Sequence, residues 1–448
     1  MPTRAGAIAV VFAANGLAGP SFLARLPERQ AALDLSDGTL GMVLVGLALG
    51  ALVASPVAGR LTNAVGSRTL AVGAAVALGG CLWLAGAAPN AGSLFAALAV
   101  IGAVDAAMDI AMNANGAIYE DRTSRSVMHR LHAAWSFGAL AAAGLAALAA
   151  TTEVPLTVHL AVVGALLAAA CLFARPALAP TEPPEAPVSP GPAPAPTPRA
   201  RLHDQPADQA APVPTAPAGT DQADPADQAG TDQTGLADQA GTGSSGRVVT
   251  AMVVLATATV AGAVIEGAPT DWSAILLQRY GTTEGVAALG VAAFTAGMVA
   301  GRLAGDWLTD RLGGARMLRL GGTLVAAGLT LGAATGHAGA FLVGLVVAGV
   351  GAAGFFPLAF SAAVRTPGVS AGAGAATVSL AARLGFLAEP VLLGAVSEAV
   401  GLRWAFGLVA GTAVLLAVTA GLIIPPNGGS GSAALRPPPP AADGVHAP

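Results

Sequence analysis

Residues 301–316 read GRLAGDWLTDRLGGAR, and residues 59–68 read GRLTNAVGSR. Each of these stretches follows a long apolar segment and leads into another one. Both copies open with Gly-Arg-Leu and close with a glycine and an arginine. A polar turn that recurs at the same place between apolar segments indicates a chain that is built from two related halves.

The apolar segments around these turns are long enough to cross a membrane, which takes about 20 residues in a helix. Of the 448 residues, 54% are hydrophobic and only 10% are charged, whereas a soluble protein carries about 25% charged residues. So few charges cannot cover a water-soluble body of this size. The sequence therefore predicts an all-α membrane protein with twelve transmembrane helices. They lie near residues 6–24, 38–58, 69–88, 93–117, 130–150, 155–174, 248–269, 284–304, 317–336, 339–363, 372–396 and 404–424.

The arginines test this number independently, because cytoplasmic loops collect positive charge. All 21 basic residues are arginine. If the N-terminus is cytoplasmic, 16 of them fall on the inner side and Arg383 lies within a span. The outer side holds only Arg25, Arg29, Arg279 and Arg403. This distribution predicts an even number of spans with both termini in the cytoplasm.

A polar insert separates the two sets of six segments. We predict a six-helix bundle over 1–175, a disordered cytoplasmic linker over 176–246, a second six-helix bundle over 247–424 and a disordered cytoplasmic tail over 425–448. The insert holds nine of the 25 acidic residues but only two of the 21 basic ones. Its Pro-Ala and Asp-Gln repeats offer little apolar surface for folding. We expect a repeat without function, and a docking segment is the alternative.

Several other classes of site lack a sequence signal. Cys81 and Cys171 each lie inside an apolar segment, so the chain shows neither a disulfide framework nor a metal-site spacing. Nucleic-acid binding needs a clustered basic face, which the sequence does not have. We therefore expect no metal, no cofactor and no nucleic-acid partner.

Two six-helix halves in the same orientation are typical of transporters that rock around a central solute site. The repeated turn resembles the signature loop of the major facilitator superfamily, in which a glycine, an Asp-Arg pair, a glycine and a basic residue recur. The second copy matches this pattern well, whereas the first has Asn63 and Ala64 where the family has an acid and a base. The resemblance implies the two-bundle fold of that superfamily.

The resemblance also implies that the turn is a gating loop, a charge latch for one conformational state. Arg302, Asp306 and Asp310 are spaced four residues apart, which lets neighbours pair along one helix face. The alternative is that the arginines of the turn only orient the protein. The predicted gating-loop residues are Gly59, Asn63, Gly66, Arg68, Asp306, Asp310, Arg311, Gly313 and Arg316.

A narrower resemblance extends over most of both halves. The stretches 105–116 (DAAMDIAMNANG), 132–138 (HAAWSFG) and 266–273 (EGAPTDWS) are similar to the MosC/YbjJ-like branch, which is related to fucose permease. This resemblance implies a small organic, often sugar-like solute. Arg383 and Glu389 depart from the branch, and the sequence assigns them no role.

Acidic residues inside the spans are candidates for function, because a central Asp costs about 2.5–3.5 kcal/mol on insertion scales. Asp105, Asp109 and Asn113 are spaced by one helical turn and share one face. Two carboxylates about 5–6 Å apart resist double ionisation, which suits a proton-coupling site. Asp109 is favoured because Asn113 flanks it. The alternative is that one acid pairs with an arginine on a neighbouring helix.

Glu266 in the seventh span is the second candidate, and by resemblance it lines the central cavity; structural pairing is its alternative. Asp271 and Trp272 lie nearer the outer end of the span. They could form a gate there, and an ordinary interfacial anchor is the alternative. His132 could pass protons, but His129 and His132 alone, without a third ligand nearby, are weak evidence for a metal.

Uncharged residues could complete the cavity lining. Asn15 and Ser361 could donate hydrogen bonds to a solute, whereas Phe355 and Phe356 could form an apolar wall or simply pack. Glycines at four-residue spacing permit close contact between helices, and we expect them on surfaces that slide between the halves. They are Gly46 and Gly50 in the second span and Gly297, Gly301 and Gly305 in the eighth.

These features predict a secondary active transporter that moves a small organic solute by alternating access with proton coupling. We expect a multi-pass monomer in a bacterial plasma membrane, with the solute, protons and the bilayer as partners. One alternative is a proton-driven exporter of apolar drug-like compounds. An intramembrane enzyme is disfavoured, because Asp105 and Asp109 share one helix and no His-Glu-x-x-His motif is present.

Overall fold

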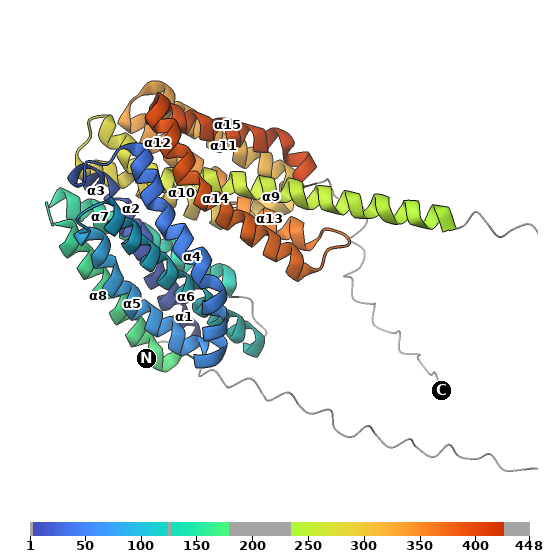
Figure 1. The fold of residues 1–448 in the computed structure, drawn as a ribbon, viewed down its shortest axis with the longest axis horizontal. Helices are drawn as coiled ribbons and strands as arrows, with labels where there is room; N and C mark the ends of the chain where they lie inside the picture. The colour runs from blue at the N-terminus through green and yellow to red at the C-terminus, as the bar shows by residue number, and fades with distance from the viewer. Residues whose placement is uncertain (1–2, 124–126, 179–233, 425–448) are drawn as a thin grey trace, which may run out of the picture. The chain divides into compact units, whose positions relative to one another are not determined.

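The computed structural model describes residues 3–123, 127–178 and 234–424, and this part of the chain contains only helices and their connections (Figure 1). Twelve helical spans are long and apolar enough to cross a membrane, which confirms the predicted number. The first half holds α1 (Arg4–Gly16), α2 (Ala18–Leu23), α3 (Leu26–Ala32), α4 (Asp37–Val65), α5 (Ser67–Ala87), α6 (Ala91–Thr123), α7 (Met128–Thr151), α8 (Leu156–Ala174) and a short 3-10 helix, η1 (Arg175–Ala177). The second half holds α9 (Thr234–Arg279), α10 (Glu284–Leu312), α11 (Gly314–Thr335), α12 (Ala338–Ala352), α13 (Phe355–Val364), α14 (Ala371–Val400) and α15 (Leu402–Ile423).

The predicted linker and tail fall largely on residues 179–233 and 425–448, which lie outside the described part of the chain. Helix α9 begins at Thr234, although the prediction placed residues 234–246 in the linker. A helix extends backwards from its apolar span until proline or competing contacts stop it, and no proline occurs between Pro225 and Pro269.

The duplicated sequence turn makes the same backbone turn in both halves. Helices α4 and α10 each contain 29 residues, and Ser36 and Thr283 occupy their N-cap positions. Both helices end at a glycine of positive φ, Gly66 at 85° and Gly313 at 79°. Glycine adopts this conformation without the steric cost that a side chain would impose. The equal lengths and equal ends indicate that the halves are two copies of one unit.

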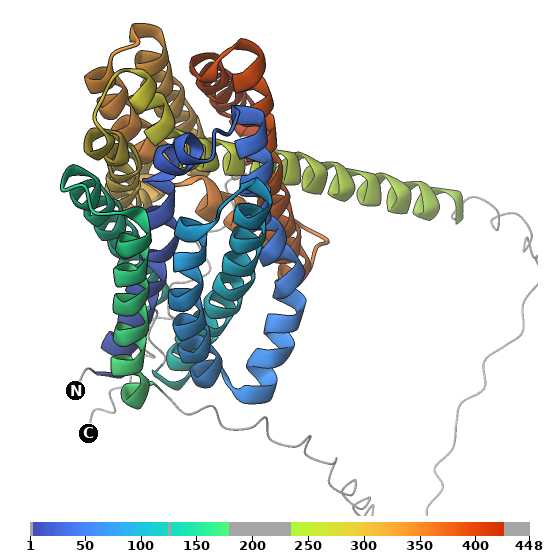
Figure 2. The ribbon, with the colours of Figure 1, turned by 60° about the vertical axis from the view of Figure 1, so that its left-hand side comes forward.

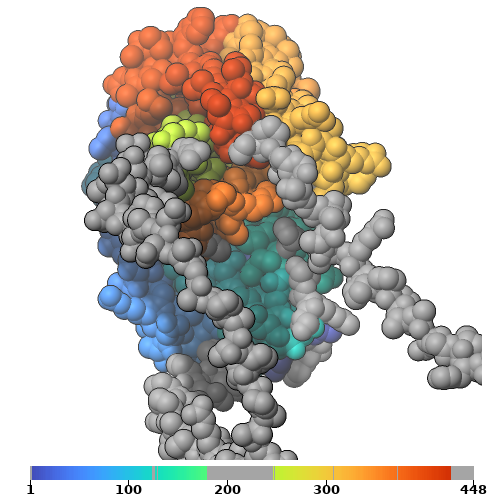
Figure 3. Space-filling view, turned by 90° about the vertical axis from the view of Figure 1, so that its right-hand side faces the viewer, coloured from blue at the N-terminus to red at the C-terminus, as the bar shows by residue number. Residues whose placement is uncertain are grey.

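The halves meet along two pairs of helices: α4 lies against α14, and α7 lies against α10 (Figure 2). A glycine permits the closest approach in each pair. A Cβ at Gly41 would lie 2.1 Å from Pro390 O, and a Cβ at Gly285 would lie 2.6 Å from Thr151 Oγ1. Figure 3 shows one face of the molecule, on which the first half (blue to teal) and the second half (yellow to red) form separate areas of the surface.

The glycines that we expected between the halves lie inside them instead. Gly46 and Gly50 contact Phe95 and Ala99 of α6, so they hold α4 to its own half. In the same way Gly297 and Gly301 contact α12 of the second half, whereas a Cβ at Gly305 would meet nothing within 4 Å. Four of the five glycines make the predicted close contacts between helices. The prediction that these contacts lie on surfaces that slide between the halves was wrong, because glycine spacing does not specify the partner helix.

We call the end of the bundle at which α3 leads into α4 the Asp37 end, and the opposite end, where α1 begins, the Arg4 end. Three of the four predicted outer arginines bind backbone carbonyls at the Asp37 end. Arg25, only 4% exposed, donates to Val154 O at 2.8 Å. Arg29 donates to Ala88 O after α5, and Arg403 donates to Ala333 O near the end of α11. A cation stabilises the partial negative charge of carbonyls at a helix C-terminus, so these arginines have structural roles.

Candidate functional site

Asn15 connects three helices of the first half at mid-span. Its side-chain Nδ2 donates to Asp105 Oδ1 at 2.7 Å, and its Oδ1 accepts a hydrogen bond from Trp135 Nε1 at 2.8 Å. Asn15 is 5% exposed, so both bonds form away from bulk solvent. The geometry holds the Asp105 carboxyl group of α6 in one orientation between α1 and α7.

Asp109 lies one turn further along α6 and faces the other half. Asn113 Nδ2 donates to Asp109 Oδ1 at 3.0 Å, and Asp109 also acts electrostatically on Asp105. Arg383 of α14 supplies positive charge to Asp109 across the interface between the halves. The sequence predicted Asp105 and Asp109 as a proton-coupling pair, with an ion pair between one acid and an arginine of another helix as the alternative. The structure places the two acids on one face and also places an arginine of another helix near Asp109. Arg383, which the sequence left without a role, is the counter-charge.

Arg302 makes a second polar connection between the halves. Its Nη1 donates to Ser136 Oγ of α7 at 2.7 Å, and its Nη2 lies 3.7 Å from Glu266 Oε1 of α9. The sequence placed Arg302 in the gating turn because the eighth apolar segment ends there. Helix α10 continues to Leu312, so Arg302 lies within the helix and contacts the centre of the bundle instead.

We call these residues the central layer, because they lie within the helical spans and together connect the two halves. The central layer consists of Asn15, Asp105, Asp109, Ser136, Glu266, Arg302 and Arg383. It contains three carboxyl groups and two guanidinium groups, so it can hold a polar solute and redistribute a proton. The described residues contain no group of three or more His, Cys, Asp or Glu that could hold a metal ion.

Asp271 and Glu389 form a second acidic pair within the second half. Their side chains, from α9 and α14, lie within hydrogen-bonding reach of one another. Glu389 is 1% exposed and Trp272 is completely buried beside it. A Trp that anchors a helix at a membrane interface keeps its N–H near water, so the burial of Trp272 argues against the anchor interpretation.

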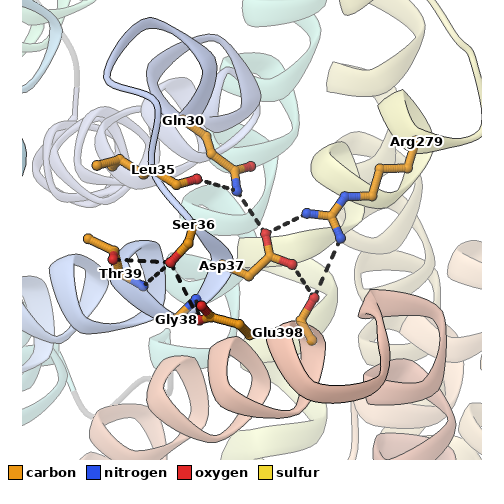
Figure 4. A network of polar contacts seen from close by, with 9 residues as sticks. Gln30, Leu35, Ser36, Asp37, Gly38, Thr39, Arg279 and Glu398 are labelled. Atoms are coloured by element: carbon orange, nitrogen blue, oxygen red, sulfur yellow. Dashed lines mark hydrogen bonds and ion pairs between the residues drawn. The ribbon is translucent and has the colours of Figure 1, made fainter.

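The two halves are joined at the Asp37 end by a network of polar side chains (Figure 4). We call this network the Asp37 cluster; it consists of Gln30, Asp37, Arg279, Ser397 and Glu398. Asp37 of α4 accepts hydrogen bonds from Arg279 of α9 and Ser397 of α14, and Gln30 Nε2 donates to its Oδ1 at 2.8 Å. Asp37 is therefore one point at which both halves meet.

Glu398 adds a further contact to the Asp37 cluster. Its Oε2 accepts hydrogen bonds from Gly38 N at 2.9 Å and from Ser36 Oγ at 3.4 Å. A carboxylate at the first turn of α4 also stabilises the positive end of that helix.

Nearby, burial raises the pKa of the Tyr280 phenol, although the charge of Arg403 opposes this effect. Tyr280 therefore stays a neutral donor, and its Oη donates to Gly332 O at 3.2 Å.

The predicted gating loops lie at the opposite, Arg4 end. Gly59, Asn63, Gly66 and Arg68 belong to the α4–α5 turn and its flanks, and Asp306, Asp310, Arg311, Gly313 and Arg316 to the α10–α11 turn and its flanks. Asp310 and Arg316 are exposed, and the Arg311 guanidinium lies over the Trp307 ring, 4.2 Å from its centroid. The side chain of Asp306 lies outside the described residues, so the predicted pairing of Arg302 with Asp306 stays untested, although Arg302 binds elsewhere.

The remaining candidates are dispersed. His132 is exposed and its ring meets Phe12 edge-on at 5.4 Å. Ser361 is exposed on α13. Phe355 and Phe356 line a small apolar pocket inside the second half together with Leu255, Thr259 and Leu416, and Phe356 stacks on Phe386. The pocket lies between helices of one half, which supports packing rather than a wall between the halves.

Sequence comparison places the chain among membrane transporters. The family model described as Major Facilitator Superfamily matches residues 5–223 and 242–444. An uncharacterized transporter, y4wD of Sinorhizobium fredii, is 28% identical over 93% of this chain and 97% of its own length. The membrane protein MosC of Rhizobium meliloti is 26% identical over 93% of this chain and 88% of its own length.

Solved structures agree with this assignment at the level of the fold. The nucleoside transporter NupG superposes with a TM-score of 0.65 at 12% identity, covering 94% of this chain and 99% of NupG. A D-xylose–proton symporter superposes with a TM-score of 0.63 at 13% identity, covering 93% of this chain and 97% of the symporter. With its twelve spans in two duplicated halves, this chain belongs to the Major Facilitator Superfamily and is a multi-pass membrane transporter.

Proposed function

We propose that the protein is a proton-coupled secondary transporter that moves a small polar organic solute across a bacterial plasma membrane. The observation that carries this proposal is that two arginines act across the central layer: the charge of Arg383 acts on Asp109, and Arg302 donates a hydrogen bond to Ser136. Both arginines belong to the second half, and both of these partners belong to the first. A solute that enters between the halves competes for these groups.

Protonation of the central layer supplies the coupling step. When Asp109 is ionised its charge attracts Arg383, which draws the halves together at that level. When Asp109 takes up a proton, Arg383 loses its counter-charge and becomes available to a hydroxyl or carbonyl oxygen of the solute. Binding of the solute then alters the proton affinity of Asp109, because linkage between two ligands is reciprocal.

Sequence similarity supports the solute class in this proposal. MosC is among the relatives, which supports the MosC-like part of the expected branch. The structural neighbours include a nucleoside transporter and a D-xylose–proton symporter. The amide, hydroxyl and charged groups of the central layer favour a polyol, sugar or nucleoside over an apolar drug-like compound.

Arginine distribution supports the orientation. We propose that the Arg4 end and both termini are cytoplasmic, since this side carries most of the arginines. The Asp37 end is then the outer end, closed by the Asp37 cluster, and the solute path leads to the Arg4 end. The six-helix halves, residues 1–175 and 247–424, move against each other as two bundles within a monomer, and the linker needs no role in this cycle.

Proteoliposomes that contain a pH-sensitive dye test the proposal directly. A panel of polyols, sugars and nucleosides is added to vesicles that carry the wild type, Asp109→Asn or Asp121→Asn. Asp121 is exposed on the same helix as Asp109, so its variant is the matched control. We expect at least one compound to change the lumenal pH with the wild type and the control but not with Asp109→Asn. Solute uptake without any pH change would contradict the coupling.

A further inference from the structure

Asp271 and Glu389 form a buried acid pair at a place that the central layer does not explain. Along α9, Asp271 lies five residues beyond Glu266 and eight before Arg279, about 7.5 and 12 Å at the rise of an α-helix. Along α14, Glu389 lies six residues beyond Arg383 and eight before Ser397, about 9 and 12 Å. The pair thus lies between the central layer and the Asp37 cluster, on the two helices that join them.

The described surroundings of the pair provide no positive charge. Arg279 is bound to Asp37, Arg302 to Ser136 and Glu266, and Arg383 faces Asp109. Among the described residues, no basic side chain contributes to the electrostatic environment of either acid. Two carboxylates without a cation repel one another strongly in a low-dielectric interior. Their close approach therefore requires a proton.

The chemistry of the contact leads to the same conclusion. An ionised carboxylate only accepts hydrogen bonds, whereas a protonated carboxyl group also donates one. The contact between Asp271 and Glu389 is therefore a hydrogen bond only if one of the two acids carries a proton. That proton stays on an oxygen of one acid and is donated to an oxygen of the other.

Neighbouring atoms show that space and hydrogen-bonding capacity are provided around Glu389. Gly267 leaves room for this side chain, because a Cβ at that position would lie 3.1 Å from Glu389 Oε2. Trp272 Nε1 faces Glu389 and is completely buried, yet neither it nor Glu389 Oε1 has a well-formed hydrogen bond within the described structure. A buried donor and acceptor that remain open beside the pair can stabilise either protonation state.

We infer that Asp271 and Glu389 form a binding site for one proton, and that this proton keeps α9 and α14 together beneath the Asp37 cluster. Loss of the proton leaves two anions on adjacent helices, which drives the helices apart. The Asp37 cluster needs Arg279 of α9 and Ser397 of α14 on the same carboxylate, so separation of the helices loosens it. Pro269 and Pro390, next to the two acids, provide the positions at which α9 and α14 can bend. The effect of the proton on the Asp37 cluster rests on the proposed function. The existence of the proton site does not depend on the proposed function.

Infrared spectroscopy on the full chain in lipid nanodiscs tests the site without any solute. The measurement is the carbonyl-stretch absorption of protonated carboxyl groups at mildly alkaline pH. It starts from an Asp105→Asn/Asp109→Asn/Glu266→Gln background, which removes the three acids of the central layer. We expect this background to retain an absorption of one protonated carboxyl group per chain, and Glu389→Gln or Asp271→Asn to remove it. Glu284→Gln, which changes an exposed acid at the start of α10, is expected to leave the absorption unchanged.

Two outcomes would overturn the inference. The first is a background protein without protonated carboxyl absorption, which needs no variant at the pair and is therefore independent of how Asp271 and Glu389 variants fold. The second is an absorption that persists undiminished in folded Glu389→Gln and Asp271→Asn proteins. Either result can occur while the transporter remains proton-coupled through Asp109, so the two proposals fail separately.

Discussion

Asp37 of α4 and Arg279 of α9 form an ion pair between the two halves, although 242 residues separate them in the sequence. The Asp37 side chain is 9% exposed and Arg279 is 40% exposed, so the carboxylate is held inside the interface and the guanidinium reaches it from the rim. Ser397 of α14 binds the same carboxylate. One acid thereby connects three helices from both halves at the Asp37 end.

Removal of this acid should open the Asp37 end. Asp37→Asn weakens hydrogen bonds to a charged partner, which contribute about 1.5–3 kcal/mol each, so we expect at least a tenfold shift of the population toward the state that is open there. Spin labels at Ala31 and Val400, both exposed, measure the distance between the halves in a chain whose two cysteines are replaced. Arg403→Gln is the control, because in the described part of the chain Arg403 donates its hydrogen bonds to Ala333 and Ala334 of the second half. An unchanged distance distribution in Asp37→Asn would refute the role of the pair.

A side chain at Gly41 should have the same effect for a steric reason. The Cβ of alanine would lie 2.1 Å from Pro390 O, so α4 and α14 cannot keep their present distance. We expect Gly41→Ala to widen the distance between the labels while each half keeps its fold. Gly19→Ala is the matched control, because a Cβ at Gly19 meets nothing within 4 Å. Equal distances in both variants would show that this contact does not limit closure.

Arg302 and Glu266 should behave as a coupled pair. Arg302→Gln leaves Glu266 without its cation in the bundle interior, and we expect a loss of about 1–3 kcal/mol in stability. The double variant Arg302→Gln/Glu266→Gln should recover part of this loss, since no unpaired charge remains. Thermal unfolding of the four proteins gives the coupling free energy. Additive losses in the double variant would mean that the contact of 3.7 Å carries no interaction.

The acid pair of α9 and α14 predicts a pH dependence of the Asp37 end. Protonation holds Asp271 and Glu389 together, so acidification should favour the closed state and alkaline conditions the open one. In the spin-label measurement we expect the distance to increase as the pH rises in the wild type. Glu389→Gln keeps a neutral hydrogen-bonding group, and its distances should no longer change over that range. The opposite direction in the wild type would contradict the inference.

The sequence predicted features that depend on local properties. Apolarity and length define the twelve spans, and the repeated glycines define equal turns after α4 and α10. The shared face of Asp105, Asp109 and Asn113 follows from helical periodicity alone. The hydrogen bond from Asn113 to Asp109 forms on this face.

Features that depend on which helices become neighbours could not be predicted in this way. Asp37 follows a serine at the start of a span, which is typical of an acid in the first turn of a helix. The sequence around its partners Arg279 and Ser397 does not indicate that they bind Asp37. Arg302 was misplaced because the end of an apolar segment does not mark the end of a helix. Glu389 and Arg383 lacked a role because their partners, Asp271 and Asp109, lie on other helices.

The most direct test of the account is the lumenal pH of proteoliposomes during solute flux. We expect a transported solute of the panel to change the lumenal pH with the wild type. Asp109→Asn should still exchange that solute but leave the lumenal pH unchanged. Flux of a solute without any change in lumenal pH, at the same rate in the wild type and in Asp109→Asn, would contradict the proposed coupling through Asp109 and Arg383.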